Sequence, residues 1–269
     1  LNSRLSDQVS NQFLATFSKL DDVRGTNSSE FPFIDISKDG DNYMALGYEL
    51  FSLNNGVHNN VFNAKDDVTI YTGSHKITAG ASYEYQMADN AYIRNGTGYY
   101  RYSSLDDFLN GATPNVVCLT YGYNGETAPA ARVQFHKAGL YAQDEWSVND
   151  NFKLTYGLRL DGLFFDNKDL MTNNAIKELD YNGRHIDTGK WPNANITVSP
   201  RVGFVWDALG DKSLKVRGGT GLFSGRLPLV FFTNMPTNAG IVKGRLTKMK
   251  DPAVLSQMIQ NGKLVTDRW

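Results

Sequence analysis

The residues most able to bind a metal are scattered through this sequence. Zinc and other transition metals are held by histidine, cysteine and carboxylate ligands at short spacings such as HxxxH. The single cysteine, Cys118, has no partner for a CxxC motif, and no two histidines stand at such a spacing. The histidines are His58, His75, His136 and His185. We therefore predict no metal site and no cofactor, a buried free thiol at Cys118, and a structural role for His75, which follows a tight turn.

Two further patterns resemble sites of phosphate binding and of nucleophilic catalysis. Gly218, Gly219 and Gly221 lie inside an expected strand rather than between a strand and a helix, so they cannot form the phosphate cradle of a glycine-rich loop. Close backbone approach or space beside the strand explains them better. Ser199 and Ser224 have no GxSxG context. The sequence thus offers no catalytic residue, and we predict that the protein is not an enzyme.

The charged residues with the clearest pattern lie on one side of alternating segments. In FKLTYGLRLD (residues 152–161) apolar and polar residues alternate strictly, which is typical of a β-strand with one apolar and one polar face. The charged residues on the polar faces of this and two later segments are Lys153, Arg159, Asp161, Arg201, Lys215 and Arg217. They could contact an anionic substrate or another domain, or form cross-strand ion pairs. We favour pairing, with Arg159 and Asp161 as partners.

These residues must be positioned by strands, of which the chain shows about seven. Residues 138–162 form two of them, joined by an Asn149-Asp150-Asn151 corner that is typical of an antiparallel hairpin. The expected strands cover residues 8–20, 57–71, 75–87, 138–148, 152–164, 196–208 and 214–225. Asp66 and Asp144 interrupt apolar faces. Pro200 lacks a backbone N–H, so we expect a sheet edge or a bulge there.

The connections between these strands alternate in length. Short turns fall near residues 72–74, 149–151 and 209–213. Long connections cover residues 21–56, 88–130, 167–195 and 226–269. In a meander this alternation places every long loop at one end. Compact soluble domains use connections of about 4–6 residues, whereas outer-membrane barrels combine short periplasmic turns with long extracellular loops.

The long loops carry some local structure and many aromatic residues. Capping and glycine signals predict short helices over residues 104–111 and 251–262, and residues 115–123 form a possible extra strand. The loop residues proposed as ligand contacts are Tyr99, Tyr100, Arg101, Tyr102, Tyr121, Tyr123, Trp191, Phe231 and Phe232. Tyrosine offers a large contact area with a polar tip. Packing of the long loops onto one another is the equally weighted alternative.

Composition limits the class of protein. The 27 basic and 28 acidic residues give a net charge of −1, which argues against a nucleic-acid partner. The 25 glycines and 12% aromatic residues favour strands and turns over helices. No apolar run reaches the ~20 residues of a membrane-spanning helix. Composition therefore predicts an all-β fold, and the long loops at one end indicate an antiparallel transmembrane β-barrel.

Four stretches carry a family resemblance. AGLYAQDEWSVNDNFKLTYGLRLDG (138–162) resembles the paired barrel strands of TonB-dependent outer-membrane receptors, particularly the Oar-like group in which a carboxypeptidase-regulatory-like domain precedes the plug. The other stretches are YTGSHKITAGASYEY (71–85), FLNGATP (108–114) and SPRVGFVWDALGDKSLKVRGGTGLFSGRLP (199–228). The resemblance implies a wide barrel in the Gram-negative outer membrane, taking up a bulky nutrient with energy passed through TonB. The implied partners are outer-membrane lipid, the protein's own plug domain, the TonB system and an unidentified substrate.

The resemblance and the strand pattern together divide the chain. We expect residues 1–225 to carry barrel strands and long extracellular loops, and residues 226–269 to belong to a further extracellular loop. The plug and the closing strands are expected outside this chain, which would be an internal portion of a larger receptor. One alternative is a soluble cell-surface β-sandwich that binds glycan or protein and buries its apolar strand faces. Another is an all-β hydrolase, which would bring two carboxylates or a Ser/His pair together.

Overall fold

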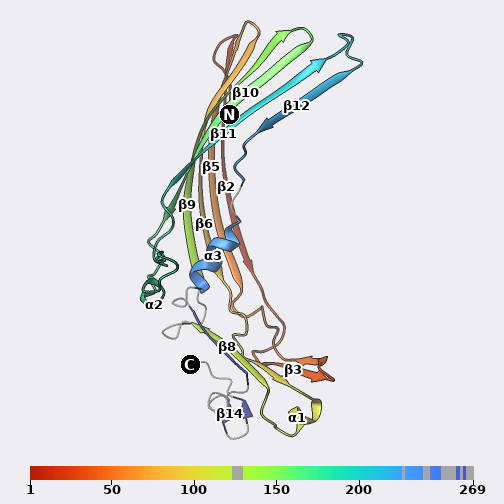
Figure 1. Ribbon diagram of the computed structural model, residues 1–269, viewed down its shortest axis with the longest axis vertical. Helices are drawn as coiled ribbons and strands as arrows, with labels where there is room; N and C mark the ends of the chain where they lie inside the picture. Colours follow the sequence, from red (N-terminus) through yellow and green to blue (C-terminus); the bar gives the residue numbers. More distant parts are fainter. Residues whose placement is uncertain (123–129, 226–227, 239–242, 250–258, 261–262, 265–269) are drawn as a thin grey trace.

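A long, curved sheet dominates the computed structural model (Figure 1). The structure describes residues 1–122, 130–225, 228–238, 243–249, 259–260 and 263–264. Eight antiparallel strands follow one another in chain order across the sheet, with β1 and β12 as its two edges. The strands are β1 (Asn2–Arg4), β2 (Val9–Val23), β5 (Gly56–Thr72), β6 (His75–Ala91), β9 (Ala130–Asn149), β10 (Phe152–Asp166), β11 (Asn195–Asp207) and β12 (Lys215–Gly221). The sheet is open, as expected for part of a barrel.

Each expected strand is present, and the differences lie mainly at the strand ends. β9 begins at Ala130 rather than at residue 138, because its first residues continue to pair with the end of β6. β12 ends at Gly221 rather than at residue 225. Residues 222–225 leave the sheet and cross one of its faces, a change of direction that the alternation of apolar residues did not predict.

The turns separate the two ends of the sheet. The short turns after β5, β9 and β11 gather at the top of Figure 1, and the described parts of the long connections lie in its lower half. Two of these short turns contain residues with positive φ, Gly73 at 56° and Gly210 at 77°, which glycine adopts without a steric penalty. The expectation that the long loops share one end is confirmed.

The convex face of the sheet is apolar and exposed. Leu140, Leu160 and Val198 stand in one row across β9, β10 and β11. They are 62%, 39% and 53% exposed. A soluble β-sandwich would bury this row against a second sheet, so that alternative is wrong. Rows of exposed leucine and valine are what the hydrocarbon core of a membrane accommodates.

Asp144, one of the two aspartates expected to interrupt the apolar strand faces, is shielded by its neighbours on the convex face. Its side chain accepts hydrogen bonds from the Tyr156 hydroxyl at 2.9 Å and contacts His75 Nδ1 at 2.7 Å. The His75 ring stacks on Trp146 with centroids 5.5 Å apart. Asp144 is therefore only 9% exposed, although its strand position points outward. The predicted structural role of His75 fits this contact.

Pro200 lies where β11 becomes a local edge. β12 pairs with β11 only from Arg201 to Asp207, and beyond Pro200 only β10 accompanies β11. The Pro200 carbonyl accepts from Leu222 N at 2.9 Å, at the point where β12 ends. In an antiparallel strand the N and C=O of one residue point toward the same neighbouring strand. The nitrogen of Pro200 therefore points to the side on which β12 ends, where no further strand needs a backbone N–H donor. The expectation of an edge is confirmed.

The long loops form a second sheet of their own. Its order is β13-β8-β7-β3-β4, in which β3 and β7 run parallel. The strands are β3 (Phe33–Lys38), β4 (Asp41–Leu46), β7 (Tyr99–Tyr102), β8 (Val116–Gly122) and β13 (Lys243–Met249). The buried core of this loop sheet comprises Ile34, Ile36, Tyr100, Tyr102, Val117 and Leu119. Three loops distant in sequence therefore fold as one unit, of which only β8 was expected.

The helices are short. α1 (Leu105–Leu109) begins after Ser104, whose side chain accepts from Asp107 N, as its sequence predicts. α2 is Asn174–Lys177, and α3 is Leu229–Asn238. Residues 251–258 of the second expected helix lie outside the described residues, and Ile259–Gln260 instead form β14, paired with β15 (Lys263–Leu264). No helix in the described part of the chain is long and apolar enough to cross a membrane.

Candidate functional site

The concave face of the large sheet carries the charged residues singled out in the sequence. Lys153, Arg159 and Asp161 alternate with the exposed leucines of β10, and therefore share the opposite face. Register with β11 and β12 places Arg201, Lys215 and Arg217 on that same concave face. The predicted polar side of the strands is thus one continuous inner wall.

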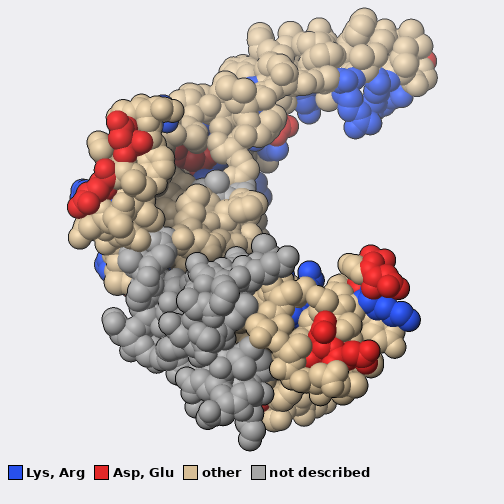
Figure 2. All heavy atoms as spheres, turned by 60° about the horizontal axis from the view of Figure 1, so that its bottom comes forward, with Lys and Arg blue, Asp and Glu red and all other residues tan. Residues whose placement is uncertain are grey.

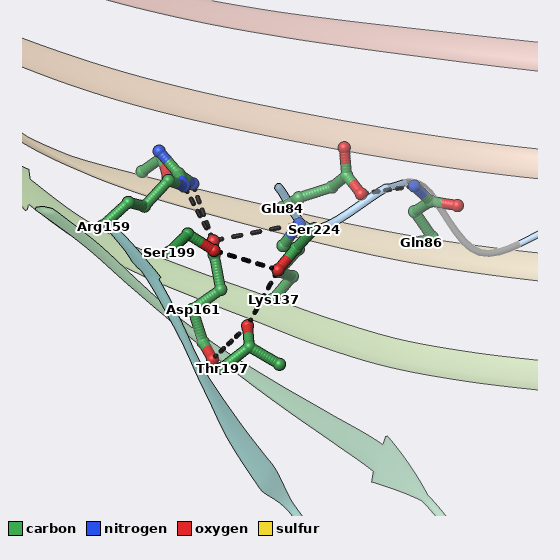
Figure 3. Close-up of polar contacts among 9 residues, drawn as sticks. Glu84, Gln86, Lys137, Arg159, Asp161, Thr197, Ser199 and Ser224 are labelled. Carbon is green, nitrogen blue, oxygen red and sulfur yellow. Dashed lines mark hydrogen bonds and ion pairs between the residues drawn. The ribbon is translucent and has the colours of Figure 1, made fainter. Parts of the chain in front are cut away.

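Arg159 and Asp161 form the centre of this wall (Figure 3). The Arg159 guanidinium donates to both carboxylate oxygens of Asp161, at 2.8 and 2.7 Å. A second guanidinium N–H of Arg159 reaches Ser82 Oγ at 2.8 Å, and Lys137 Nζ lies 3.8 Å from Asp161. Asp161 is only 4% exposed. The predicted mutual pairing of these residues is confirmed, and the charge at this point of the wall is largely compensated.

The segment that follows β12 crosses over this pair. Ser224 Oγ lies 3.3 Å from Ser199 Oγ and donates to Thr197 Oγ1 at 3.1 Å, which holds the segment against β11 (Figure 3). Among the described residues no histidine or carboxylate side chain bonds these three hydroxyls. In the described part of the chain these hydroxyls therefore lack the adjacent base that the hydrolase alternative requires.

A cavity of about 780 Å³ lies between the crossing segment and the wall. Its lining combines apolar side chains with hydroxyls, amides and paired charges. The contributing residues include Leu14, Asn63, Phe135, Lys137, Arg159 and Ser224. A concave, mostly apolar space with a few convergent polar groups suits the binding of a solute.

α3 covers the same face nearer the long loops. Phe232 packs against Phe165 and Trp191, with ring centroids 5.3 and 5.6 Å apart. Asn90 of β6 donates to Thr233 Oγ1 of α3 at 3.3 Å. Phe165 and Asn90 both point to the concave face, so α3 lies within the curve of the sheet rather than outside it. Sequence reasoning missed this inward fold; the adjacent aromatic residues 231 and 232 were its only signal.

The expected loop contacts divide according to burial. Tyr100 and Tyr102 are 1% and 5% exposed in the core of the loop sheet, so they take the packing role. Trp191 is 9% exposed beside α3, whereas Phe231 is 63% exposed. The side chain of Tyr121 and the whole of Tyr123 lie outside the described residues.

Tyr99 and Arg101 lie on the opposite face of the loop sheet and line a groove. The Tyr99 hydroxyl donates to Asp35 at 2.7 Å, and Arg101 Nε donates to the same carboxylate oxygen at 2.8 Å. Burial and the hydrogen bond to Asp35 raise the pKa of Tyr99 to about 12, so this hydroxyl stays protonated at neutral pH. The groove holds about 610 Å³ and is also lined by Phe33, Tyr43 and Arg94.

Comparison with known proteins places this geometry in a family. Residues 2–262 match the family described as the outer membrane beta barrel domain. A solved structure titled copper transporter OprC is similar at 16% identity with a TM-score of 0.43. That alignment covers 81% of this chain but 28% of the transporter chain, so the chain spans little more than a quarter of that protein. No curated protein matches. The chain belongs to the outer membrane beta-barrel family and is part of a barrel in the Gram-negative outer membrane.

Proposed function

We propose that this chain is the barrel portion of a TonB-dependent receptor, which captures a bulky nutrient at extracellular loops and passes it inward with energy supplied through TonB. The observation that carries the proposal is the asymmetry of the sheet. Short turns occupy one end, and structured loops rich in aromatic residues occupy the other. Short periplasmic turns and long extracellular loops are the usual arrangement of outer-membrane barrels.

The two faces of the sheet support a conduit. The convex face presents exposed apolar rows to lipid, and the concave face presents hydroxyls, amides and charges to the lumen. The groove beside Tyr99 and Arg101 is the proposed capture site in the loops, and the inner wall is the proposed path. Both are built for binding and passage without chemistry. The resemblance to the Oar-like group adds the proposal that a plug domain gates the path.

Topology is tested with the full-length receptor in its source organism. An epitope inserted after Gly183, in an exposed turn of the long loop, should be labelled by antibody on intact cells. The same epitope inserted after Asp150, in a short turn, should be labelled only after the outer membrane is opened. Labelling of the Asp150 insertion on intact cells would reverse the proposed orientation.

Energy coupling needs a separate experiment. The full-length receptor should be photo-crosslinked to TonB in wild-type cells, and loss of TonB should abolish growth on the nutrient that requires the receptor. The crosslink should disappear when the region preceding the plug is deleted. Growth that requires the receptor but not TonB would indicate passive diffusion through the barrel and would refute energy coupling through TonB.

A further inference from the structure

The cations of the inner wall fall into two groups. Lys76 lies 2.9 Å from Glu145, Arg159 lies 2.7 Å from Asp161, and Lys65 lies 2.6 Å from Asp67. Within the described residues, four other inner-wall cations have no carboxylate oxygen within 4.0 Å. These are Lys153, Arg201, Lys215 and Arg217, all of them exposed. Pairing with a carboxylate on the same or a neighbouring strand therefore explains the first group but not the second.

The four cations of the second group surround a floor of glycines. In register, Lys153 and Arg217 flank Val205 on either side of β11. The next inward-facing row contains Gly203 and Gly219, and the row beyond it contains Gly157, Arg201 and Gly221. Because glycine has no side chain, these positions leave a depression in the inner surface between the cations. We call this surface the basic trough.

These glycines sit where two backbones approach closely. A Cβ at Gly157 would lie 2.9 Å from the carbonyl oxygen of Ala142, and a Cβ at Gly219 would lie 2.9 Å from that of Val202. Larger residues would therefore require the strands to shift as well as fill the trough. The expectation of close backbone approach is confirmed for Gly219 and Gly221, whereas a Cβ at Gly218 would meet the ring of Phe204. The absence of side chains has the further effect of leaving the floor of the trough accessible.

Nearby carboxylates are already engaged. Asp207 stands opposite Lys215 in register, but its oxygens accept from the backbone N–H groups of Gly210 at 3.1 Å and Lys212 at 2.9 Å. Glu145, the nearest acid on β9, is held by Lys76. Figure 2 shows Lys and Arg atoms gathered on the inner side of the upper arm of the sheet. The trough therefore keeps a net positive charge of its own.

We propose that the basic trough binds a solute carrying several carboxylate or phosphate groups, and that such an anion is the class of cargo the barrel passes. The inference rests on the proposed function and deepens it. The trough lies near the short turns, so under the proposed orientation it is the last part of this wall that cargo meets before the periplasm. Backbones of Lys153 and Arg217 are about 10 Å apart across two strand spacings, so both side chains reach one anion held between them.

The binding must be electrostatic and salt-dependent. Exposed charges interact through a high effective dielectric, so each cation contributes modestly and several must act together. Removing two of the four cations should weaken the binding of a multivalent anion at least tenfold. Raising the salt concentration should also weaken the binding of this anion to the wild type.

The test uses the purified full-length receptor in detergent, with inorganic tripolyphosphate and citrate as probes in equilibrium dialysis. The variant is Lys153→Gln/Arg217→Gln, and the matched control is Lys65→Gln on β5, which removes an inner-wall cation that already has a partner and lies away from the trough. We expect saturable binding to the wild type and the control, and at least a tenfold loss in the double variant. A second variant, Lys153→Arg/Arg217→Lys, keeps the charges and should keep the binding.

Several results would overturn the proposal. These are the absence of saturable binding of either anion, equal binding by the double variant, or equal loss in the Lys65 control. Heat-modifiable gel migration shows that each variant is folded, so a loss of binding is not a loss of structure. Because the assay needs neither TonB nor transport, its failure leaves the proposed receptor function standing, and failure of TonB coupling leaves the anion site standing.

Discussion

Replacing Leu158 by arginine tests which face of the sheet meets lipid. Leu158 lies near the middle of β10, opposite Ala142 and Pro200, and is 46% exposed on the convex face. The loss of leucine packing is small because nearly half of the side chain has no protein neighbour. The charge dominates, at about 2–4 kcal/mol for arginine near the bilayer midplane. At 1.36 kcal/mol per factor of ten, this is roughly a 30- to 900-fold shift toward the unfolded state.

The matched control is Thr155→Arg on the concave face. Thr155 faces Glu145 and Gly203 in register, so an arginine there has water, space and a carboxylate within reach. We expect this variant to assemble like the wild type, while Leu158→Arg is depleted from the outer membrane. The assay is the fraction of the full-length protein that migrates as the folded form in unheated gels of outer-membrane fractions. Equal assembly of both variants, or selective loss of Thr155→Arg, would refute the assignment of the faces.

Three further variants probe the wall, the convex cluster and the loops. Arg159→Met should lower the free energy of unfolding by about 1–3 kcal/mol in urea titrations, because the buried Asp161 loses its bidentate partner; no change would contradict the pairing. Tyr156→Phe should lower the urea midpoint, because Asp144 loses a donor in a shielded position; an unchanged midpoint would show that lipid or water replaces it. The pKa of Asp187 is lowered to about 2 by hydrogen bonds from Thr172 and the Gly189 N–H and by Lys177. Because the pKa of Asp187 is lower in the folded loop, its ionised carboxylate stabilises that loop at pH values above the ordinary pKa of 3.8, and this stabilisation is lost as the pH falls toward 2. Pepsin should therefore cut residues 170–190 faster at pH 2 than at pH 4. Asp187→Asn should remove the difference, with an unfolded substrate correcting for the activity of pepsin itself.

The strands were predictable because their information is local. Alternation of apolar and polar residues fixes the faces, and glycines in turns mark where the chain reverses. The Arg159 and Asp161 pair was predictable for the same reason, since two residues apart on one strand means neighbours on one face. The edge at Pro200 was predictable because proline lacks the backbone N–H that a neighbouring strand would need.

The arrangement of the loops could not be predicted from such local signals. The parallel pairing of β3 with β7 joins segments on either side of two long strands, and the contact of Arg101 with Asp35 exists only once that pairing has formed. The inward position of α3 depends on Phe232 meeting Phe165 and Trp191, which come from different parts of the chain. Each of these arrangements is decided by long-range contacts that leave no periodic trace in the sequence.

The distribution of charge along the inner wall has a consequence for passage. Near the crossing segment the charges are paired, so an ionic group gains little there and is not held. At the basic trough none of the four cations has a carboxylate oxygen within 4.0 Å in the described part of the chain, so the same group is attracted toward the short turns. A conduit must bind strongly enough to draw cargo in and weakly enough to release it. Exposed cations in a solvated lumen meet both conditions. Salt and water weaken each ionic contact enough for release, while the four cations together still attract an anion toward the short turns.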